Sequence, residues 1–224
     1  MKIAIFHNFL DNIGGAEIVA LTLSRELDAD IYTTNINSQK IKKMGFSDTL
    51  SRIKSIGKVP INAPFRQQLA LFRFRKLNLK NNYDFYIIAG DWAVSAAVNN
   101  KPNLWYVHSP IREIWDLYDY VKYNLVTSWK HPLFDFWVRF NRHLNKKYIK
   151  HIGKIASNSI NTKNRVKKYL NREAVVIYPP TETSKYKSKK SKDYWLSVNR
   201  LISHKRIDMQ IKAFSKLSNE KLII

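Results

Sequence analysis

Cysteine is absent from the 224 residues of this sequence. Without it the chain can form no disulfide framework, no thiolate metal site and no cysteine nucleophile. Histidine, aspartate and glutamate do not stand at metal-ligand spacing either, and no Ser-His-Asp arrangement or G-x-S-x-G motif is present. We therefore expect no metal and no covalent nucleophile, and the lack of cysteine favours a cytoplasmic protein.

Long apolar runs are also absent. No window approaches the ~18 uninterrupted apolar residues that a transmembrane helix needs, and the apolar run after Lys2 has only four residues. That run is too short for the apolar core of a signal peptide. We expect neither a signal peptide nor a membrane-spanning helix.

Acidic residues are few, because 17 Asp and Glu face 39 Lys and Arg, for a net charge of +22. Such a charge attracts polyanions. Residues 139–172 contain eleven Lys and Arg and no acid. Two interpretations stay open: a solvated basic face, or a surface that rests on anionic headgroups at the inner face of the cell membrane, where each basic residue contributes about 1 kcal/mol.

What is present is enough apolar sequence for a core, with 45% hydrophobic residues. Strand-like runs alternate with helix-like segments from the N-terminus to residue 109 and again over 154–180. The expected strands cover 2–7, 30–35, 51–56, 84–90, 103–109, 154–159 and 174–180, and the expected helices cover 15–27, 64–79, 92–98 and 161–170. This alternation predicts an α/β fold with a Rossmann-like, doubly wound parallel sheet.

Residues 111–152 interrupt this rhythm with an aromatic-rich, mostly helical segment that we expect to break at Pro132. Its apolar positions outnumber what one buried face needs. We expect them to be core; the alternative is an exposed apolar patch beside the basic run, which suits an interfacial membrane contact.

The composition also predicts domain limits. Residues 1–180 form the first domain, the polar stretch 181–192 is a linker, and 193–224 begin a second domain with a strand, a helix and the start of another strand. That second piece has too little core to fold alone.

Two loops of the first domain are candidate sites. Gly14 and Gly15 lie between the first strand and the first helix, where backbone N–H groups can approach an anion, although a purely structural turn is the alternative. His108 follows a strand, and ligands of open α/β sheets bind beyond the carboxyl ends of strands. It can bond a sugar hydroxyl or a phosphate, or carry a proton; the alternative is a structural histidine before Pro110.

Polar side chains follow the next expected strand. Asn158, Ser159 and Thr162 can bind polar ligands or cap the next helix, and we expect Asn161 to be the cap.

Cations gather where the helix of the second domain begins. Lys205 and Arg206 there cost about 0.3–1 kcal/mol each against the helix dipole unless something compensates. A bound anion would reverse that sign, and Arg200 and Lys205 could converge on a diphosphate. The alternative is an exposed loop whose charges are screened by water.

Four segments in this order resemble glycosyltransferase family 4, a group of retaining, nucleotide-sugar-dependent enzymes with the GT-B fold. They are "NIGGAE", "WYVHSPIREIWD", "SNSINTKNRVKKYLNREAVVIYPP" and "WLSVNRLISHKRIDMQIKAFSKL". These segments are most similar to those of the mannosyltransferases that build O-antigen and related surface polysaccharides. The resemblance implies transfer of a hexose, mannose above all, from a GDP- or UDP-linked donor to a glycan or lipid-linked acceptor, without a metal or other cofactor.

The resemblance also implies roles for the candidate residues. Gly14 and Gly15 would line the cleft near the donor phosphate, His108 would face the reacting sugar or the acceptor, and Arg200 and Lys205 would hold the diphosphate. The family's glycine loop and spaced pair of glutamates have no counterpart here, and Glu220 does not belong to that motif. We therefore expect a C-terminally truncated enzyme that lacks most of its donor domain.

Two other hypotheses stay open. One is a non-enzymatic basic module that binds an anionic membrane surface or nucleic acid, and the other is an inactive gene fragment. The glycosyltransferase hypothesis itself implies no specific nucleic-acid partner.

Overall fold

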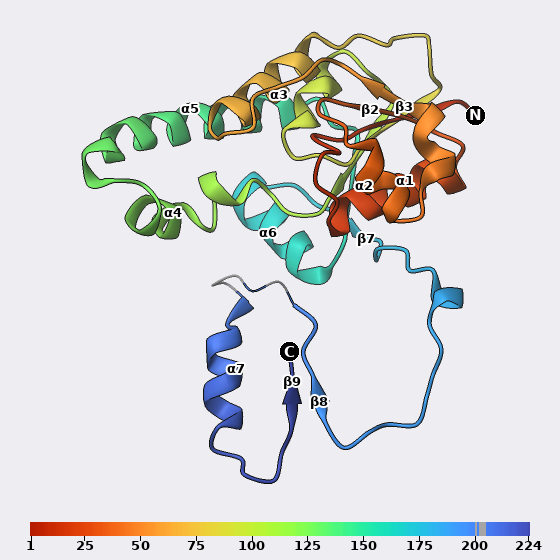
Figure 1. The fold of residues 1–224 in the computed structure, drawn as a ribbon. Helices are drawn as coiled ribbons and strands as arrows, with labels where there is room; N and C mark the ends of the chain where they lie inside the picture. The colour runs from red at the N-terminus through yellow and green to blue at the C-terminus, as the bar shows by residue number, and fades with distance from the viewer. Residues whose placement is uncertain (200, 202–204) are drawn as a thin grey trace. The chain divides into compact units, whose positions relative to one another are not determined.

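The computed structural model describes residues 1–199, 201 and 205–224. These fall into two units, Met1–Pro180 and Thr181–Ile224 (Figure 1). The strands are β1 (Ile3–Phe6), β2 (Asp30–Thr33), β3 (Ile53–Ser55), β4 (Phe85–Ile88), β5 (Asn103–Val107), β6 (Lys154–Ser157), β7 (Val175–Val176), β8 (Trp195–Leu196) and β9 (Leu222–Ile223). The α-helices are α1 (Gly15–Glu26), α2 (Ser38–Lys43), α3 (Phe65–Lys76), α4 (Tyr118–Asn124), α5 (His131–Ile149), α6 (Ile160–Leu170) and α7 (Ile207–Phe214). Short 3-10 helices are η1 (Ser47–Arg52), η2 (Ala93–Val98), η3 (Arg112–Ile114), η4 (Ser128–Lys130) and η5 (Thr183–Lys185).

The first unit is built on a seven-stranded sheet in the order β3-β2-β1-β4-β5-β6-β7, and every pair in it is parallel. The predicted doubly wound α/β fold is therefore confirmed. The chain winds outward in one direction from β1 to β3, then returns to the middle and winds the other way from β4. The strand order thus reverses between β1 and β4, where ligands of such sheets bind.

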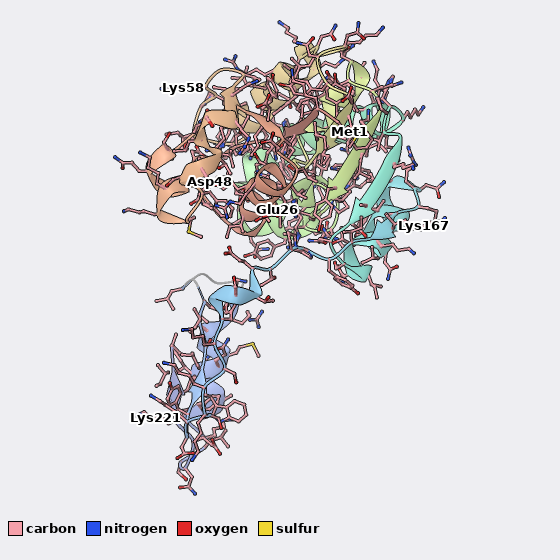
Figure 2. All side chains as sticks on the ribbon, turned by 90° about the vertical axis from the view of Figure 1, so that its right-hand side faces the viewer. Met1, Glu26, Asp48, Lys58, Lys167 and Lys221 are labelled. Carbon is pink, nitrogen blue, oxygen red and sulfur yellow. The ribbon has the colours of Figure 1, made fainter. Side chains whose placement is uncertain are left out.

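Side chains alternate across the sheet and enter two separate cores. On β1, Ala4 and Phe6 join a core with α3, η2 and α5, whereas Ile3 and Ile5 join a core with α1 and α2. The strands are buried on both faces because helices cover both, which explains their uninterrupted apolar sequences. Figure 2 shows the charged residues Glu26, Asp48, Lys58 and Lys167 around the outside of this unit, where all four are exposed.

The local predictions agree with the structure only in part. The helical segment is interrupted between α4 and α5, next to the predicted break, and Pro132 lies in the first turn of α5, where its missing N–H has no partner to lose. The expected helix over 92–98 is the 3-10 helix η2. On α1, Val19, Ala20 and Leu21 are buried in the core, while Leu27 at its end is 39% exposed.

The aromatic segment divides between the two interpretations offered for it. Trp115, Phe134 and Trp137 are partly buried against the core. Leu125 and Trp129 are exposed, and so are Tyr120 and Phe140, which overturns the expectation that the whole set is core. Figure 1 shows α4 and the start of α5 extending from the side of the first unit, so part of this hairpin has no sheet to cover it.

The second unit is a β8-α7-β9 arrangement with parallel strands. Trp195 of β8 contacts the ring of Phe214, and its indole nitrogen donates to Glu220 at 2.7 Å. Ile207 is the one hydrophobic residue buried among those described in this unit. Residues 186–193 carry no helix or strand.

Candidate functional site

The candidate site of the first unit lies at the edge where its strands end. Because the strands are parallel, their carboxyl ends share one edge. His7 follows β1, Asp91 comes shortly after β4, His108 follows β5 and Asn158 follows β6. These polar residues therefore lie at one edge of the sheet, on both sides of the point between β1 and β4 where the strand order reverses.

His7 forms the centre of a first group of contacts. Its ring is 3% exposed, and its Nε2 lies 3.2 Å from Oε1 of Glu17 on α1. Burial acts to raise the pKa of the Glu17 carboxyl, but the hydrogen bond and charge of His7 outweigh it and lower that pKa below its usual value. Within the described part of the chain, Nδ1 of His7 has no hydrogen-bond partner.

Glu17 also forms a hydrogen bond to one of the two glycines, Gly14. Its Oε2 accepts a 2.8 Å hydrogen bond from the backbone N–H of Gly14, the residue at the N-cap of α1. The N–H of Gly14 is therefore already bonded to a carboxylate, and an anion there would have to displace it. A side chain on Gly15 would meet no atom within 4 Å.

Asn8 and Asp91 join the ends of β1 and β4. The Asn8 amide donates to Oδ1 of Asp91 at 2.5 Å, and its oxygen accepts from the N–H groups of Trp92 and Ala93 at 3.1 and 2.9 Å. Gly90 makes room for this contact, because a Cβ there would lie 2.2 Å from the Asn8 oxygen. Burial, helped by the charge of Glu113 in η3, raises the pKa of Asp91 to about 6.

His108 lies half-buried beside this group and contacts the ring of Tyr106 edge-on at 5.1 Å. Burial first, and the charge of His7 second, lower its pKa to about 4. The imidazole is therefore neutral near pH 7, able to donate one hydrogen bond and accept another. Its Nε2 is buried and has no partner among the described residues.

The residues after β6 are occupied with helix capping. Ser159 is the N-cap of α6, and its hydroxyl accepts from the N–H of Thr162 at 3.2 Å. The expected cap, Asn161, instead lies inside the first turn. The side-chain oxygen Oδ1 of Asn158 accepts from the Ser159 hydroxyl, and the Thr162 hydroxyl donates to the backbone oxygen of His108. This chain of bonds links α6 to the end of β5.

The cationic residues of the second unit are described only in part. Arg200 lies outside the described residues, so its predicted convergence with Lys205 has no geometry here. Lys205 is exposed just before α7, and Arg206 is the residue that caps this helix, with φ +54°. Asp208 is in the first turn of α7, where it offsets part of the positive charge.

Sequence reasoning found His108 but missed His7, Glu17, Asp91 and Glu113. The signal that singled out His108, a titratable residue beyond a strand, also applied to His7 and Asp91. Glu17 and Glu113 lie on helices, and only the fold brings them to this edge. No group of three or more His, Asp or Glu residues within the described ranges is arranged to hold a metal ion, and none of the helices described is long and apolar enough to cross a membrane.

Neither a protein-family model nor a curated protein matches the sequence. Solved structures of HepE from Anabaena do match the fold. The HepE complex with UDP and glucose aligns with a TM-score of 0.68 and 13% identity over 99% of this chain and 60% of that one. The HepE complexes with UDP and with UDP-glucose align over 100% of this chain and 69% of theirs, with TM-scores of 0.63 and 0.59 at 13% and 10% identity. The chain thus shares their fold and spans about two thirds of their length.

The arrangement presents polar atoms to a ligand. Among the described residues, Nδ1 of His7 and Nε2 of His108 have no hydrogen-bond partner, and the carboxyl groups of Glu17 and Asp91 lie at the same edge, where α/β sheets bind ligands. Buried polar atoms without partners cost free energy unless a ligand or water satisfies them.

Proposed function

We propose that this chain is part of a retaining glycosyltransferase that transfers a hexose from a nucleotide sugar to a growing, lipid-linked polysaccharide. One observation supports this above all: 99% of the chain aligns with a HepE structure that contains UDP and glucose. The motif resemblance to family 4 adds the retaining chemistry and the polysaccharide acceptor. Because the chain spans 60% of that HepE chain, the activity belongs to the whole enzyme and is proposed as such.

Two arguments favour different sugar donors. The resemblance to surface-polysaccharide mannosyltransferases favours GDP-mannose, whereas the HepE complexes contain UDP and UDP-glucose. We propose mannose as the sugar, with a UDP-hexose as the competing donor, and both belong in the same experiment.

The proposed reaction needs no protein nucleophile. The acceptor oxygen forms a bond to the anomeric carbon on the face from which the phosphate leaves, and the departing phosphate oxygen takes the acceptor proton. The protein's part is then electrostatic stabilisation and positioning. Lys205 and Arg200 are proposed to hold the diphosphate, and His108, as a neutral imidazole, to bond a sugar hydroxyl.

The nucleic-acid form of the competing basic-module hypothesis is weakened, because several cations of the basic run already have partners inside the protein. Arg142 and Arg172 donate to backbone oxygens, and Arg165 is paired with Asp116. Lys167 is paired with Glu173. These cations have partners inside the protein, so the run is not one free basic face for a nucleic-acid backbone.

The test is calorimetric titration with UDP, GDP, UDP-glucose and GDP-mannose, carried out on the whole enzyme of which this chain is proposed to be part. We expect one nucleotide sugar to bind. His108→Ala should weaken the sugar nucleotide about 2–10-fold, the value of one neutral hydrogen bond, while the matching nucleoside diphosphate is unaffected. Lys205→Ala should weaken both.

Matched controls are His143→Ala and Lys212→Ala, which replace exposed residues on α5 and α7. They should bind like the unaltered chain. If no nucleotide or nucleotide sugar binds, or if His143→Ala lowers affinity as much as His108→Ala does, the proposal is wrong.

A further inference from the structure

The α4–α5 hairpin exposes a set of large apolar side chains, which we call the apolar surface. Three of its members, Trp129, Leu133 and Phe136, are 76%, 72% and 73% exposed. The full set is Tyr120, Tyr123, Leu125, Trp129, Leu133, Phe136 and Phe140. Leu133, Phe136 and Phe140 follow the spacing i, i+3, i+7, which places them along one side of α5. Exposed large apolar side chains that gather on one hairpin indicate an interaction site.

Ordered contacts hold this hairpin together. Asp135 of α5 accepts a 2.6 Å hydrogen bond from the Tyr118 hydroxyl and a 2.8 Å bond from Lys122, both on α4. The rings of Tyr118 and Phe134 stack at 5.9 Å. The opposite side of α5 is fixed in the core through residues such as Val138. The apolar surface is therefore presented by packed helices rather than by a loose segment.

Basic residues run beside the apolar surface on α5. Arg139, Lys146 and Lys150, spaced i, i+7, i+11, are exposed, and so is Lys147; we call these four the basic flank. Lys146 and Lys150 also line a cavity of about 460 Å³ near the ends of α5 and α6, together with Lys168 and Arg172. Cations at a helix C-terminus complement its dipole, but that does not require an apolar stripe beside them.

We propose that the apolar surface and the basic flank dock this protein on an anionic bilayer, with α5 lying in the interface. A helix with an apolar side and a cationic side has the composition of interfacial helices, and Trp129 of η4 lies just before α5. The apolar side chains enter the headgroup region while Arg139, Lys146, Lys147 and Lys150 meet lipid phosphates. The cavity adds Lys168 as a further cation for a headgroup.

A second copy of the chain is a poorer occupant of the same surface. Each copy carries a net charge of +22, and an isologous pair would bring the two basic flanks into one interface. Like charges placed together oppose association. An anionic surface has the opposite sign and removes that cost.

The test is flotation of the full chain with vesicles of phosphatidylcholine alone or mixed with phosphatidylglycerol. We expect binding to the mixed vesicles that salt weakens. The double variant Trp129→Gln, Phe136→Gln and the double variant Lys146→Glu, Lys150→Glu should each lower the partition coefficient about tenfold or more, since each cation near the surface contributes measurably. All altered residues are exposed, and far-ultraviolet circular dichroism will confirm that the variants fold.

Two control variants carry matched changes elsewhere. Ile61→Gln with Phe65→Gln removes exposed apolar side chains outside the hairpin, and Lys42→Glu with Lys43→Glu reverses exposed charges on α2. Both should float like the unaltered chain. Three outcomes would overturn the proposal: no binding to either vesicle, equal binding to neutral vesicles, or a dimer in sedimentation velocity that the Trp129→Gln, Phe136→Gln variant dissociates.

Discussion

At the scale of single residues, the sheet edge holds a histidine and an aspartate whose pKa values shift in opposite directions. Burial lowers the pKa of half-buried His108 to about 4 and raises the pKa of Asp91 to about 6. Both shifts favour the neutral form because burial disfavours charge. Between about pH 4 and 6 these two groups therefore carry less charge than ordinary pKa values would give them.

These shifts predict opposite pH dependences for two variants. Between pH 4 and 6.5 the unfolded chain binds more protons at His108, so this residue lowers the free energy of unfolding as pH falls through that range. Between pH 3.8 and 6 the folded chain binds more protons at Asp91, so this residue raises it as pH falls. Each effect amounts to at most about 3 kcal/mol.

The measurement is the free energy of unfolding in urea from pH 4 to 7 for His108→Gln and Asp91→Asn. The difference between the unaltered chain and His108→Gln should decrease as pH falls, and the difference for Asp91→Asn should increase. His143→Gln, at an exposed site, should give a constant difference. Equal slopes for the first two variants would contradict the assigned environments.

A second residue-scale prediction concerns the glycines. Gly90→Ala should destabilise the fold by about 1–3 kcal/mol, because the new Cβ would lie 2.2 Å from the Asn8 amide oxygen. Gly15→Ala should be neutral or stabilising by about 0.4–1 kcal/mol, because open space surrounds it and alanine favours a helix. Urea unfolding of both variants is the measurement, and a Gly90→Ala protein as stable as Gly15→Ala would show that the contact relaxes freely.

At the scale of elements, helix ends were harder to predict than helix existence. The segment 161–170 is helical as predicted, but α6 begins at Ile160 with Ser159 as its cap. Both Ser159 and Asn161 are residues that cap helices well. Only the backbone position of the first turn decides between them, and that position follows from where β6 ends.

The assignment predicts different costs for the two residues. Ser159→Ala should lower the free energy of unfolding by about 0.5–2 kcal/mol, since the N–H of Thr162 loses its acceptor. Asn161→Ala should change it by less than about 0.5 kcal/mol, because alanine is favourable inside a helix. Thermal unfolding followed by circular dichroism will compare them, and a larger loss for Asn161→Ala would assign the cap to Asn161.

At the scale of the whole molecule, the two units differ in how much core they hold. The first contains both hydrophobic clusters that line the two faces of the sheet. In the second, Trp195, Leu196 and Ile211 are all more than half exposed. A unit that buries so little apolar surface cannot offset the entropy of ordering its chain.

Expressed separately, residues 1–180 should unfold in one cooperative thermal transition, and residues 181–224 should show none. Circular dichroism from 10 to 90 °C is the measurement, with guanidinium as a second denaturant. A cooperative transition in the isolated second piece would mean that its β8-α7-β9 arrangement is stable without further core.

The sequence by itself determined the fold class, the strands of the first unit and the place of His108 beyond the carboxyl end of a strand. These follow from local periodicity and from the alternation of strands and helices, which need no tertiary information. The tertiary structure decided the rest. It places Glu17 next to His7 and Glu113 near Asp91, bonds the N–H of Gly14 to a carboxylate, and leaves Trp129 and Phe136 exposed. These contacts join distant segments, and they depend on packing that the periodicity of the sequence does not contain.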